Sequence, residues 1–324
     1  MFNILACVQA GRLQYEAVLL AASLRAMAPG FAGTLFLAEP QPGPLWPDDP
    51  RVADPDARAL LRDLGAVVLP FESRVFGAAY PNGNKIEALA ALPEAPFLFL
   101  DTDTLVLGAI DAVPYDFARP AASLRREGTW PAETLYGPGP DAVWRALHDR
   151  FGTDFEATLD PAWPADHWRR YLYLNAGWFF HESPAAFGAR YLAVARAIRD
   201  DPGPALLGQE LFPWLDQIAL PMVLAHFGGG RPGPALAGLD GAVTCHWRAL
   251  PLLYARESDA AVAVLESVCA PNRVKRVLKR HPPLHRLVYQ GEGARARALF
   301  DRAALPPREQ TIRNVLKREG LWLR

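Results

Sequence analysis

The chain has 324 residues, of which 51% are hydrophobic and 21% charged, and its formal net charge at pH 7 is -1. A chain of this length buries a large core, in one or two domains, without disulfides or structural metals. The balanced charge excludes the net basic field that is usual for nucleic-acid-binding proteins, so we expect no nucleic-acid partner.

The three cysteines form no CxxC pair and no disulfide framework, which favours a reducing compartment. The first residues lack the basic start and long apolar run of a signal peptide, and no apolar run reaches the roughly 18 residues of a membrane span. We therefore expect a cytoplasmic protein.

The first hundred residues alternate short apolar runs with helical patterns. We expect strands at residues 3–8, 34–39, 66–71 and 97–101, and helices at 15–27, 54–64 and 84–92. Strands that alternate with helices predict βαβ units, and therefore a mostly parallel central sheet with helices on both faces. The expected fold class is α/β.

The second half is less regular. We expect strands at residues 121–125, 171–180 and 242–247, helices at 185–199, 210–226 and 258–269, and a glycine-rich loop at 227–241. Residues 129–168 are rich in proline, tryptophan and aspartate and have weak periodicity, so the sequence gives no assignment there. The tail from residue 273 is basic and mostly helical. We predict a main domain over residues 1–255 and a helical C-terminal appendage over residues 256–324.

The segment FLFLDTDTLVL carries the most chemical information, because a buried run leads directly into Asp101 and Asp103. Residues i and i+2 of an extended chain point to the same side, so both carboxylates face the carboxyl edge of the sheet, where α/β sheets bind ligands. Two such charges repel each other unless a cation lies between them or one is protonated. Oxygen ligands favour Mg²⁺ or Mn²⁺. The alternative is a solvated turn at the end of a strand.

Two reactions use such a pair of carboxylates. In the first, the pair holds a divalent ion that bridges the diphosphate of a nucleotide-sugar. In the second, Asp101 is a nucleophile toward phosphate and Asp103 is its acid/base partner. FLFLDTDTLV also fits this second signature, that of haloacid-dehalogenase-type phosphatases. That signature normally opens the chain, whereas Asp101 lies far from the start.

The segment NKIEALAALPEAPFLFLDTDTLVL resembles the metal-binding segment of GT-A fold glycosyltransferases, in particular the family 8-like group that contains glycogenin and the bacterial lipooligosaccharide galactosyltransferases. YLNAGWFF, LDQIAL and CHW are similar to further motifs of that family, in the same order. The resemblance covers about residues 1–250. It implies that the main domain is a GT-A catalytic domain that binds a nucleotide-sugar.

The resemblance also implies a role for each matching residue. Asp101, Asp103 and His246 would hold Mn²⁺ or Mg²⁺; Lys85, Asn175, Gly177 and Arg248 would bind the donor; Asp216 and Gln217 would face the transferred sugar at the catalytic centre. Each residue also has a structural explanation: an exposed helix cation, a strand bulge, a helix cap or a core histidine. Because side chains alternate along a strand, we expect His246 to face away from its neighbours Cys245 and Trp247.

Two positions depart from the family pattern. Gln9 stands where the family often has an acidic residue that contacts the nucleotide base. After the late histidine the family usually continues with glycine and lysine, whereas this chain continues with Trp247 and Arg248. We expect the planar guanidinium of Arg248 to replace that lysine at the donor's diphosphate.

The expected function is transfer of a hexose from a nucleoside-diphosphate sugar, most simply a UDP-sugar, to a hydroxyl of a saccharide or lipid-linked acceptor. The family retains the anomeric configuration. Two alternatives stay open: a haloacid-dehalogenase-type phosphatase that uses Asp101, and a non-catalytic protein that binds a nucleotide-sugar on the same fold.

The basic segment at residues 272–287 carries Val274, Val277 and Leu278 on one face of a cationic helix. Such a helix can lie on an anionic membrane surface, which would put the protein on the inner face of the membrane. The alternative is an ordinary helix that packs on the domain.

Overall fold

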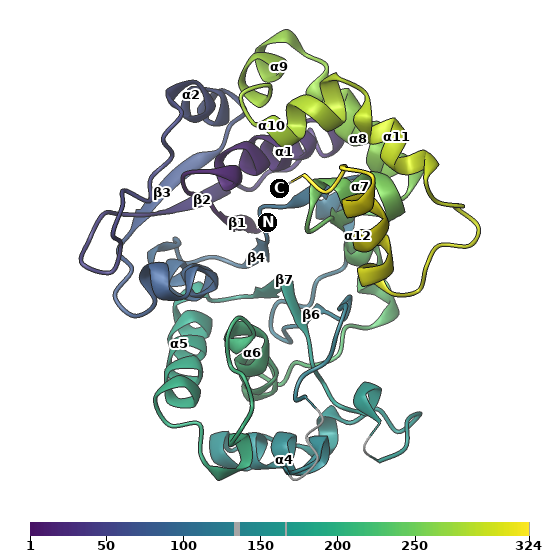
Figure 1. The fold of residues 1–324 in the computed structure, drawn as a ribbon. Helices are drawn as coiled ribbons and strands as arrows, with labels where there is room; N and C mark the ends of the chain where they lie inside the picture. The colour runs from purple at the N-terminus through teal and green to yellow at the C-terminus, as the bar shows by residue number, and fades with distance from the viewer. Residues whose placement is uncertain (133–136, 166, 324) are drawn as a thin grey trace.

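The computed structural model describes residues 1–132, 137–165 and 167–323 of the chain. A six-stranded sheet lies at the centre of the molecule, in the order β3-β2-β1-β4-β7-β6 (Figure 1). Its strands are β1 (Asn3–Cys7), β2 (Leu35–Pro40), β3 (Val67–Phe71), β4 (Phe97–Leu100), β6 (Ala122–Ser123) and β7 (Asn175–His181). Strands β3, β2, β1 and β4 are parallel, whereas β7 and β6 are antiparallel to their neighbours. The predicted α/β class with a mainly parallel sheet is confirmed.

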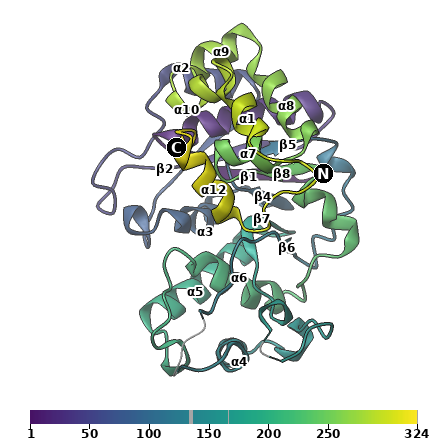
Figure 2. The same cartoon turned by 45° about the vertical axis from the view of Figure 1, so that its right-hand side comes forward.

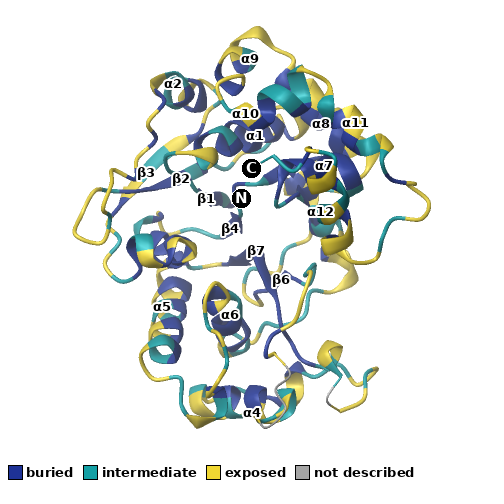
Figure 3. Cartoon of the chain, in the orientation of Figure 1, coloured by how far each residue is buried: buried dark blue, intermediate teal, exposed yellow. Residues whose placement is uncertain are grey.

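Alternate residues of the central strands β1, β4 and β7 enter separate cores on the two faces of the sheet. In β1, Ile4 belongs to the core under α1 (Arg12–Met27), whereas Leu5 belongs to the core under α5 (Pro184–Asp200). Figures 1 and 3 show helices over both faces, with their buried sides turned toward the sheet. Burial on both faces explains why these strands have continuous apolar sequences rather than alternating ones.

The short helices between the first strands have local sequence causes. Helix α2 (Pro55–Asp63) begins where the Asp54 side chain accepts hydrogen bonds from the backbone N–H groups of Asp56 and Ala57, with proline at the first helical position. Helix α3 (Asn84–Glu87) continues into a 3₁₀ turn at Ala88–Ala91, so the predicted helix at residues 84–92 is present but only partly α-helical.

A second, two-stranded sheet was not predicted. It pairs β5 (Thr104–Val106) with β8 (Thr244–His246) in antiparallel register, so that Thr104 lies opposite His246. The intervening chain includes α6 (Leu215–His226) and the 3₁₀ segment Pro234–Asp240. This small sheet brings a late segment of the chain beside the carboxyl end of β4.

Several predicted bounds are wrong. The strand expected at residues 171–180 begins only at Asn175, and the helix expected from residue 210 begins at Leu215, after Pro213 and Trp214. Within the unassigned stretch at 129–168 the structure has helix α4 (Pro140–Phe151), closed by a left-handed Gly152; residues 133–136 and 166 lie outside the described residues.

The C-terminal part is helical, as predicted. It contains α7 (Leu250–Arg256), α8 (Asp259–Cys269), α9 (Asn272–Leu278), α10 (Pro282–Leu284), a π-helical turn at His285–Tyr289, α11 (Glu292–Ala298) and α12 (Glu309–Arg318). Helix α8 packs on α1, and α11 and α12 pack on α7 (Figure 2). The division at residue 255 stays a prediction.

The apolar face of the basic segment is buried. Val274, Val277 and Leu278 belong to the core under α1, and Arg280 pairs with Asp54, with 2.7 Å between Nη1 and Oδ1. These three side chains are therefore not available to a membrane surface in this structure, which favours the helix that packs on the domain. Peripheral contact of residues 272–287 with a membrane stays a prediction. Among the described residues, no helix combines the length and apolar character needed to cross a bilayer.

Candidate active site

Two aspartates flank the turn between β4 and β5. Asp101 directly follows β4, and its backbone N–H donates to the Gly177 carbonyl of β7 at 2.8 Å. Asp103 directly precedes β5, and between the two the Thr102 hydroxyl donates to the Cys7 carbonyl at the end of β1. The turn is thus fixed to both neighbours of β4, and both carboxylates lie at the carboxyl edge of the sheet, as the sequence predicted.

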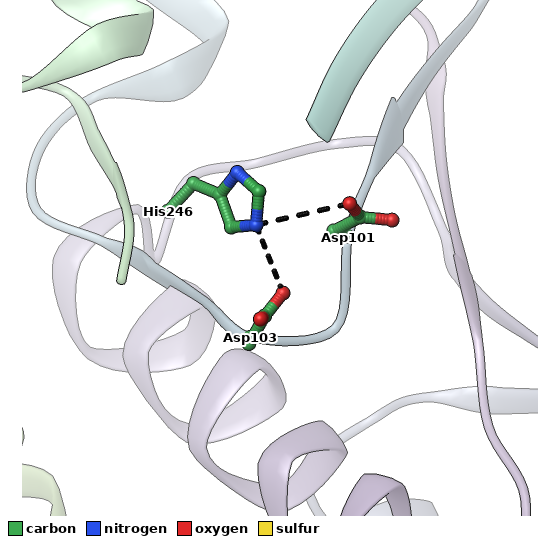
Figure 4. A group of neighbouring side chains, drawn as sticks. All are labelled: Asp101, Asp103 and His246. Atoms are coloured by element: carbon green, nitrogen blue, oxygen red, sulfur yellow. Dashed lines mark ion pairs between the residues drawn. The ribbon is translucent and has the colours of Figure 1, made fainter. Parts of the chain in front are cut away.

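His246 completes this group from the other strand of the small sheet (Figure 4). Its Nε2 lies 3.1 Å from Asp103 Oδ1 and 3.7 Å from Asp101 Oδ2. The pairing of β5 with β8 places His246 there, while its neighbours Cys245 and Trp247 are buried on the opposite side in the core. The predicted alternation along this strand is confirmed.

The three side chains offer a donor set that fits a divalent cation. One ligand atom from each of Asp101, Asp103 and His246 lies within 4.8 Å of the others. Two carboxylate oxygens and one imidazole nitrogen suit Mn²⁺ or a similar ion. The ligand oxygens and the nitrogen are therefore already gathered where such an ion would bind.

The charges of Asp101, Asp103 and His246 shift the pKa values within this cluster. Burial alone would raise the pKa of Asp103, but the adjacent His246 holds the pKa of that carboxyl well below its usual range. Burial opposes the charged form of His246, yet the carboxylates of Asp103 and Asp101 raise the pKa of the imidazole above its ordinary value. Negative charge thus dominates the position between these side chains.

Lys85 lies between two carboxylates rather than at an open surface. Its Nζ is 2.9 Å from Asp101 Oδ1 and 3.2 Å from Asp216 Oδ2, and it donates to the Ala176 carbonyl at 3.1 Å. Burial opposes the charged ammonium, but the charges of Asp101 and Asp216 raise the pKa of Lys85 above its ordinary value. The lysine holds Asp101 by one oxygen and leaves Oδ2, the one nearer His246, free.

Two tyrosines that the sequence analysis missed fix the Asp-Gln pair of α6. The Tyr80 hydroxyl donates to Asp216 Oδ1 at 2.7 Å and accepts from the Asp216 backbone N–H at 2.9 Å. The Tyr173 hydroxyl donates to Gln217 Oε1 at 2.8 Å. Asp216 is buried, while Gln217 is half-buried. Nothing in the local sequence pairs either tyrosine with α6, because both lie far from it along the chain.

Because Gly177 has no side chain, it leaves the space that the His246 imidazole occupies. A methyl group added at Gly177 would lie 2.3 Å from His246 Nδ1 and 2.7 Å from Asn175 Oδ1, and the Asn175 side chain accepts from the Gly177 N–H at 2.7 Å. The group that approaches this glycine closely is therefore the His246 side chain of the protein itself.

Replacing Gly177 by alanine is expected to displace His246 and to weaken Mn²⁺ binding about 10- to 100-fold, the range for groups that orient metal ligands. Titration calorimetry with Mn²⁺ would measure the loss. Gly43→Ala is the control, because a Cβ there meets nothing within 4 Å. An unchanged affinity in Gly177→Ala would contradict this account of the glycine.

A cavity of about 490 Å³ opens in front of these residues. All but one of the predicted site residues line it: Lys85, Asp101, Asp103, Asn175, Asp216, Gln217, His246 and Arg248. The exception is Gly177, which lies behind His246. Gln9, the residue expected near the nucleotide base, also lines the cavity and accepts a hydrogen bond from the Asn84 amide at 3.2 Å.

Three arginines line this cavity, from widely separated parts of the chain. The backbone of Arg248 is left-handed (φ 63°), and its side-chain Nη1 lies 3.0 Å from Oε2 of Glu309 on α12. Arg313 of α12 and Arg12 of α1 are the others, and the sequence analysis identified neither. Because Arg313 lies on α12, this C-terminal helix contributes to the wall of the site.

Glu16 lies beside Arg12. Burial and the charge of Asp103 raise the pKa of the Glu16 carboxyl to about 8.

The comparisons with known proteins bear on the family and the fold of the chain. Residues 4–228 match the model of the Rhodobacterales glycosyltransferase domain. No curated protein sequence matches the chain. Among solved structures, the chain is similar to the galactosyltransferase LgtC in complex with donor and acceptor sugar analogs, with 13% identity over 85% of this chain and 99% of that one and a TM-score of 0.50. This similarity supports a GT-A fold.

Two further solved structures show weaker similarity. The bifunctional glycosyltransferase WbbM is 11% identical over 86% of this chain and 51% of that one, with a TM-score of 0.48. The glycosyltransferase GlyE of Streptococcus pneumoniae is 12% identical over 72% of this chain and 46% of that one, with a TM-score of 0.37.

Proposed function

Because the chain belongs to the family of Rhodobacterales glycosyltransferase domains, we propose that it transfers a hexose from a nucleoside-diphosphate sugar, in the simplest case a UDP-sugar, to a hydroxyl of a saccharide or lipid-linked acceptor. The observation that carries the proposal is the convergence of Asp101, Asp103 and His246 at one end of the cavity, with Asp216 and Gln217 on its wall. Such a transfer breaks the bond between a sugar and a diphosphate. The cavity therefore needs one set of residues that binds the diphosphate and another that binds the sugar.

Asp101 Oδ2, Asp103 and His246 Nε2 would hold Mn²⁺ or Mg²⁺ in this proposal. A divalent ion bound there would supply Lewis-acid stabilisation of the charge that develops on the leaving diphosphate. Arg12, Arg248 and Arg313 on the cavity wall would bind the phosphate oxygens, for which a planar guanidinium is suited. Lys85 would act through Asp101 and Asp216, whose carboxylates it holds, rather than on the phosphates.

Asp216 and Gln217 would bind the transferred sugar. Asp216 is held by Tyr80 and Lys85 at separate oxygens, and Gln217 is held by Tyr173 at its carbonyl oxygen, which leaves the amide nitrogen for substrate. Side chains that are fixed before the substrate binds lose little freedom in the transition state, which favours catalysis. Retention of the anomeric configuration is part of the proposal.

A panel of nucleotide-sugars tests the function directly. With Mn²⁺ and no acceptor, we expect the purified chain to release nucleoside diphosphate from at least one member, and NMR of a product formed with an acceptor to show the donor's anomeric configuration. Tight donor binding by calorimetry without any turnover would instead select the non-catalytic alternative. Failure of the folded protein both to bind and to turn over every donor would contradict the proposal.

Removal of divalent ions tests whether donor turnover requires a bound metal ion. EDTA is expected to reduce donor turnover at least 100-fold, because three ligands lose the ion that neutralises the leaving group, and added Mn²⁺ is expected to restore it. The measurement is nucleoside diphosphate release before and after chelation. Full activity after exhaustive dialysis against EDTA would show that the reaction needs no ion at this group.

A further inference from the structure

A second cavity adjoins the proposed donor site. It has a volume of about 650 Å³, and Arg248 and Arg313 line both cavities. Its walls come from residues 126–129, from Trp168 and Arg169, from Trp214 and from α12. Trp214 directly precedes α6, which carries Asp216 and Gln217, so a molecule in the second cavity would extend toward the proposed transfer point.

Arg126 and Arg169 give this wall of the cavity a positive charge. Arg126, which lines the cavity, donates to the carbonyls of Tyr173 at 3.0 Å and Trp168 at 3.2 Å. The neighbouring Arg231, which does not line it, donates to the carbonyl of Arg170 at 2.9 Å. Within the described chain, no carboxylate lies within 4 Å of the charged groups of Arg126, Arg169 or Arg231, although the chain has as many acidic as basic residues.

The two glutamates of the same cavity do not compensate these charges. Glu127 pairs with Arg248 and Arg256, and Glu309 pairs with Arg248, Arg256 and Arg313. Burial and the neighbouring charges of Arg231 and Arg169 lower the pKa of Arg126 to about 10, so it stays protonated at neutral pH. Among the described residues, no carboxylate pairs with Arg126 or Arg169 on this side of the cavity.

Two tryptophans line the same cavity with part of their rings exposed. Trp168 is 37% exposed and Trp214 is 39% exposed, whereas most large aromatic side chains of the described chain are buried. The guanidinium carbons of Arg126 and Arg169 lie 4.6 Å and 4.9 Å from the centre of the Trp168 ring. Because these two guanidinium groups lie over the Trp168 ring, they hold positive charge at the wall for an anionic substituent, while Trp214 presents a flat apolar surface for the C–H face of a sugar.

We propose that this cavity binds the acceptor, and that the acceptor sugar carries a negatively charged group, a carboxylate or a phosphate, which Arg126 and Arg169 bind while the ring packs on Trp214. The proposal rests on the proposed function, in which the adjoining cavity holds the activated donor. In the transfer, an acceptor hydroxyl forms the new bond to the anomeric carbon. The bond from that carbon to the diphosphate breaks, and the diphosphate leaves with the electron pair and takes up the hydroxyl proton.

Acceptor sugars that differ in charge test whether the cavity prefers an anionic acceptor. The probes are methyl glucoside, methyl glucuronide and glucose 6-phosphate, with the corresponding galactose series. With a donor that the enzyme turns over, we expect kcat/KM for at least one charged acceptor to exceed that of the neutral sugar about tenfold or more, since a hydrogen bond to a charged group contributes that much. The carboxylate and phosphate arms identify which anion is bound. Equal use of charged and neutral acceptors would overturn the proposal.

Arg169→Gln separates this site from the donor site. Arg169 is exposed, so its replacement leaves the core intact. We expect KM for the charged acceptor to rise about tenfold, with donor hydrolysis in the absence of acceptor unchanged. Arg25→Gln, an exposed arginine on α1 far from this cavity in the chain, is the matched control. An equal loss of hydrolysis and transfer in Arg169→Gln would count against an acceptor role.

A binding measurement keeps the inference testable if no donor is turned over. Calorimetric titration of the donor-free protein with methyl glucuronide, glucose 6-phosphate and methyl glucoside is expected to show tighter binding of a charged sugar, and the preference is expected to disappear in Arg169→Gln and to weaken with salt. No preference among the three sugars would overturn the inference. Absence of donor turnover with the preference intact would instead count against the proposed function alone.

Discussion

Asp103→Asn is expected to reduce the rate of sugar transfer about 100- to 1,000-fold while leaving the fold intact. Asp103 supplies one of the two carboxylates of the Asp-Asp-His group, and its oxygen is the one closest to His246. Asparagine keeps the shape but removes the negative charge that a divalent ion requires, and loss of one electrostatic contact to the leaving group costs a rate factor of about this size.

The measurement pairs kinetics with metal binding. Transfer rates and Mn²⁺ affinity, the latter by titration calorimetry, are expected to fall together, with an unchanged circular dichroism spectrum. Asp111→Asn is the matched control, because Asp111 is an exposed aspartate on the same segment of chain and does not line the cavity. Wild-type activity and wild-type Mn²⁺ affinity in Asp103→Asn would refute the proposed metal site.

Lys85→Met is expected to lower the free energy of unfolding by about 3–5 kcal/mol, the cost of removing one partner from a buried ion pair. Lys85 is 7% exposed and is the shared partner of Asp101 and Asp216. Without the ammonium, two carboxylates near each other lose their counter-charge, and Asp216 is almost completely buried. Methionine preserves most of the side-chain volume, so the loss reports charge rather than a cavity. Urea denaturation of the two proteins would measure it.

Two further variants separate this effect from a general loss of charge. Lys317→Met removes an exposed lysine from α12 and is expected to change the free energy of unfolding by less than about 0.5 kcal/mol. The double variant Lys85→Met/Asp216→Asn is expected to recover part of the stability, because it removes one of the uncompensated charges. If Lys85→Met unfolds at the same urea concentration as the wild type, the buried ion pair does not stabilise the fold.

Local sequence was a good guide to elements whose cause is local. The apolar run at residues 97–100 forms the strand that leads into Asp101, and the alternation around His246 correctly separates it from Cys245 and Trp247. Helix α4 was missed because its surroundings are rich in proline and aspartate. The start of α6 was placed too early, at residue 210, because the apolar pattern before Pro213 resembles that of the helix, which begins only at Leu215. The resemblance to GT-A glycosyltransferases is confirmed by the family match.

The residues of the proposed acceptor cavity are not connected by any local sequence pattern. Arg126, Trp168 and Trp214 come from segments without a clear periodic pattern, and the sequence offered no reason to group them. Helix α12 was expected only as part of a basic tail, yet Glu309 and Arg313 line the cavities. Such groupings depend on how distant segments pack.

By itself the sequence determined that a buried parallel strand leads directly into Asp101 and Asp103, because apolar burial acts over a few neighbouring residues. Only the tertiary structure decided that the pairing of Thr104 with His246 adds an imidazole, that Lys85 lies between Asp101 and Asp216, and that α12 reaches the site. These contacts join residues far apart along the chain, and they form only when the small sheet and the C-terminal helices bury their apolar faces against the core, a condition that no local pattern contains.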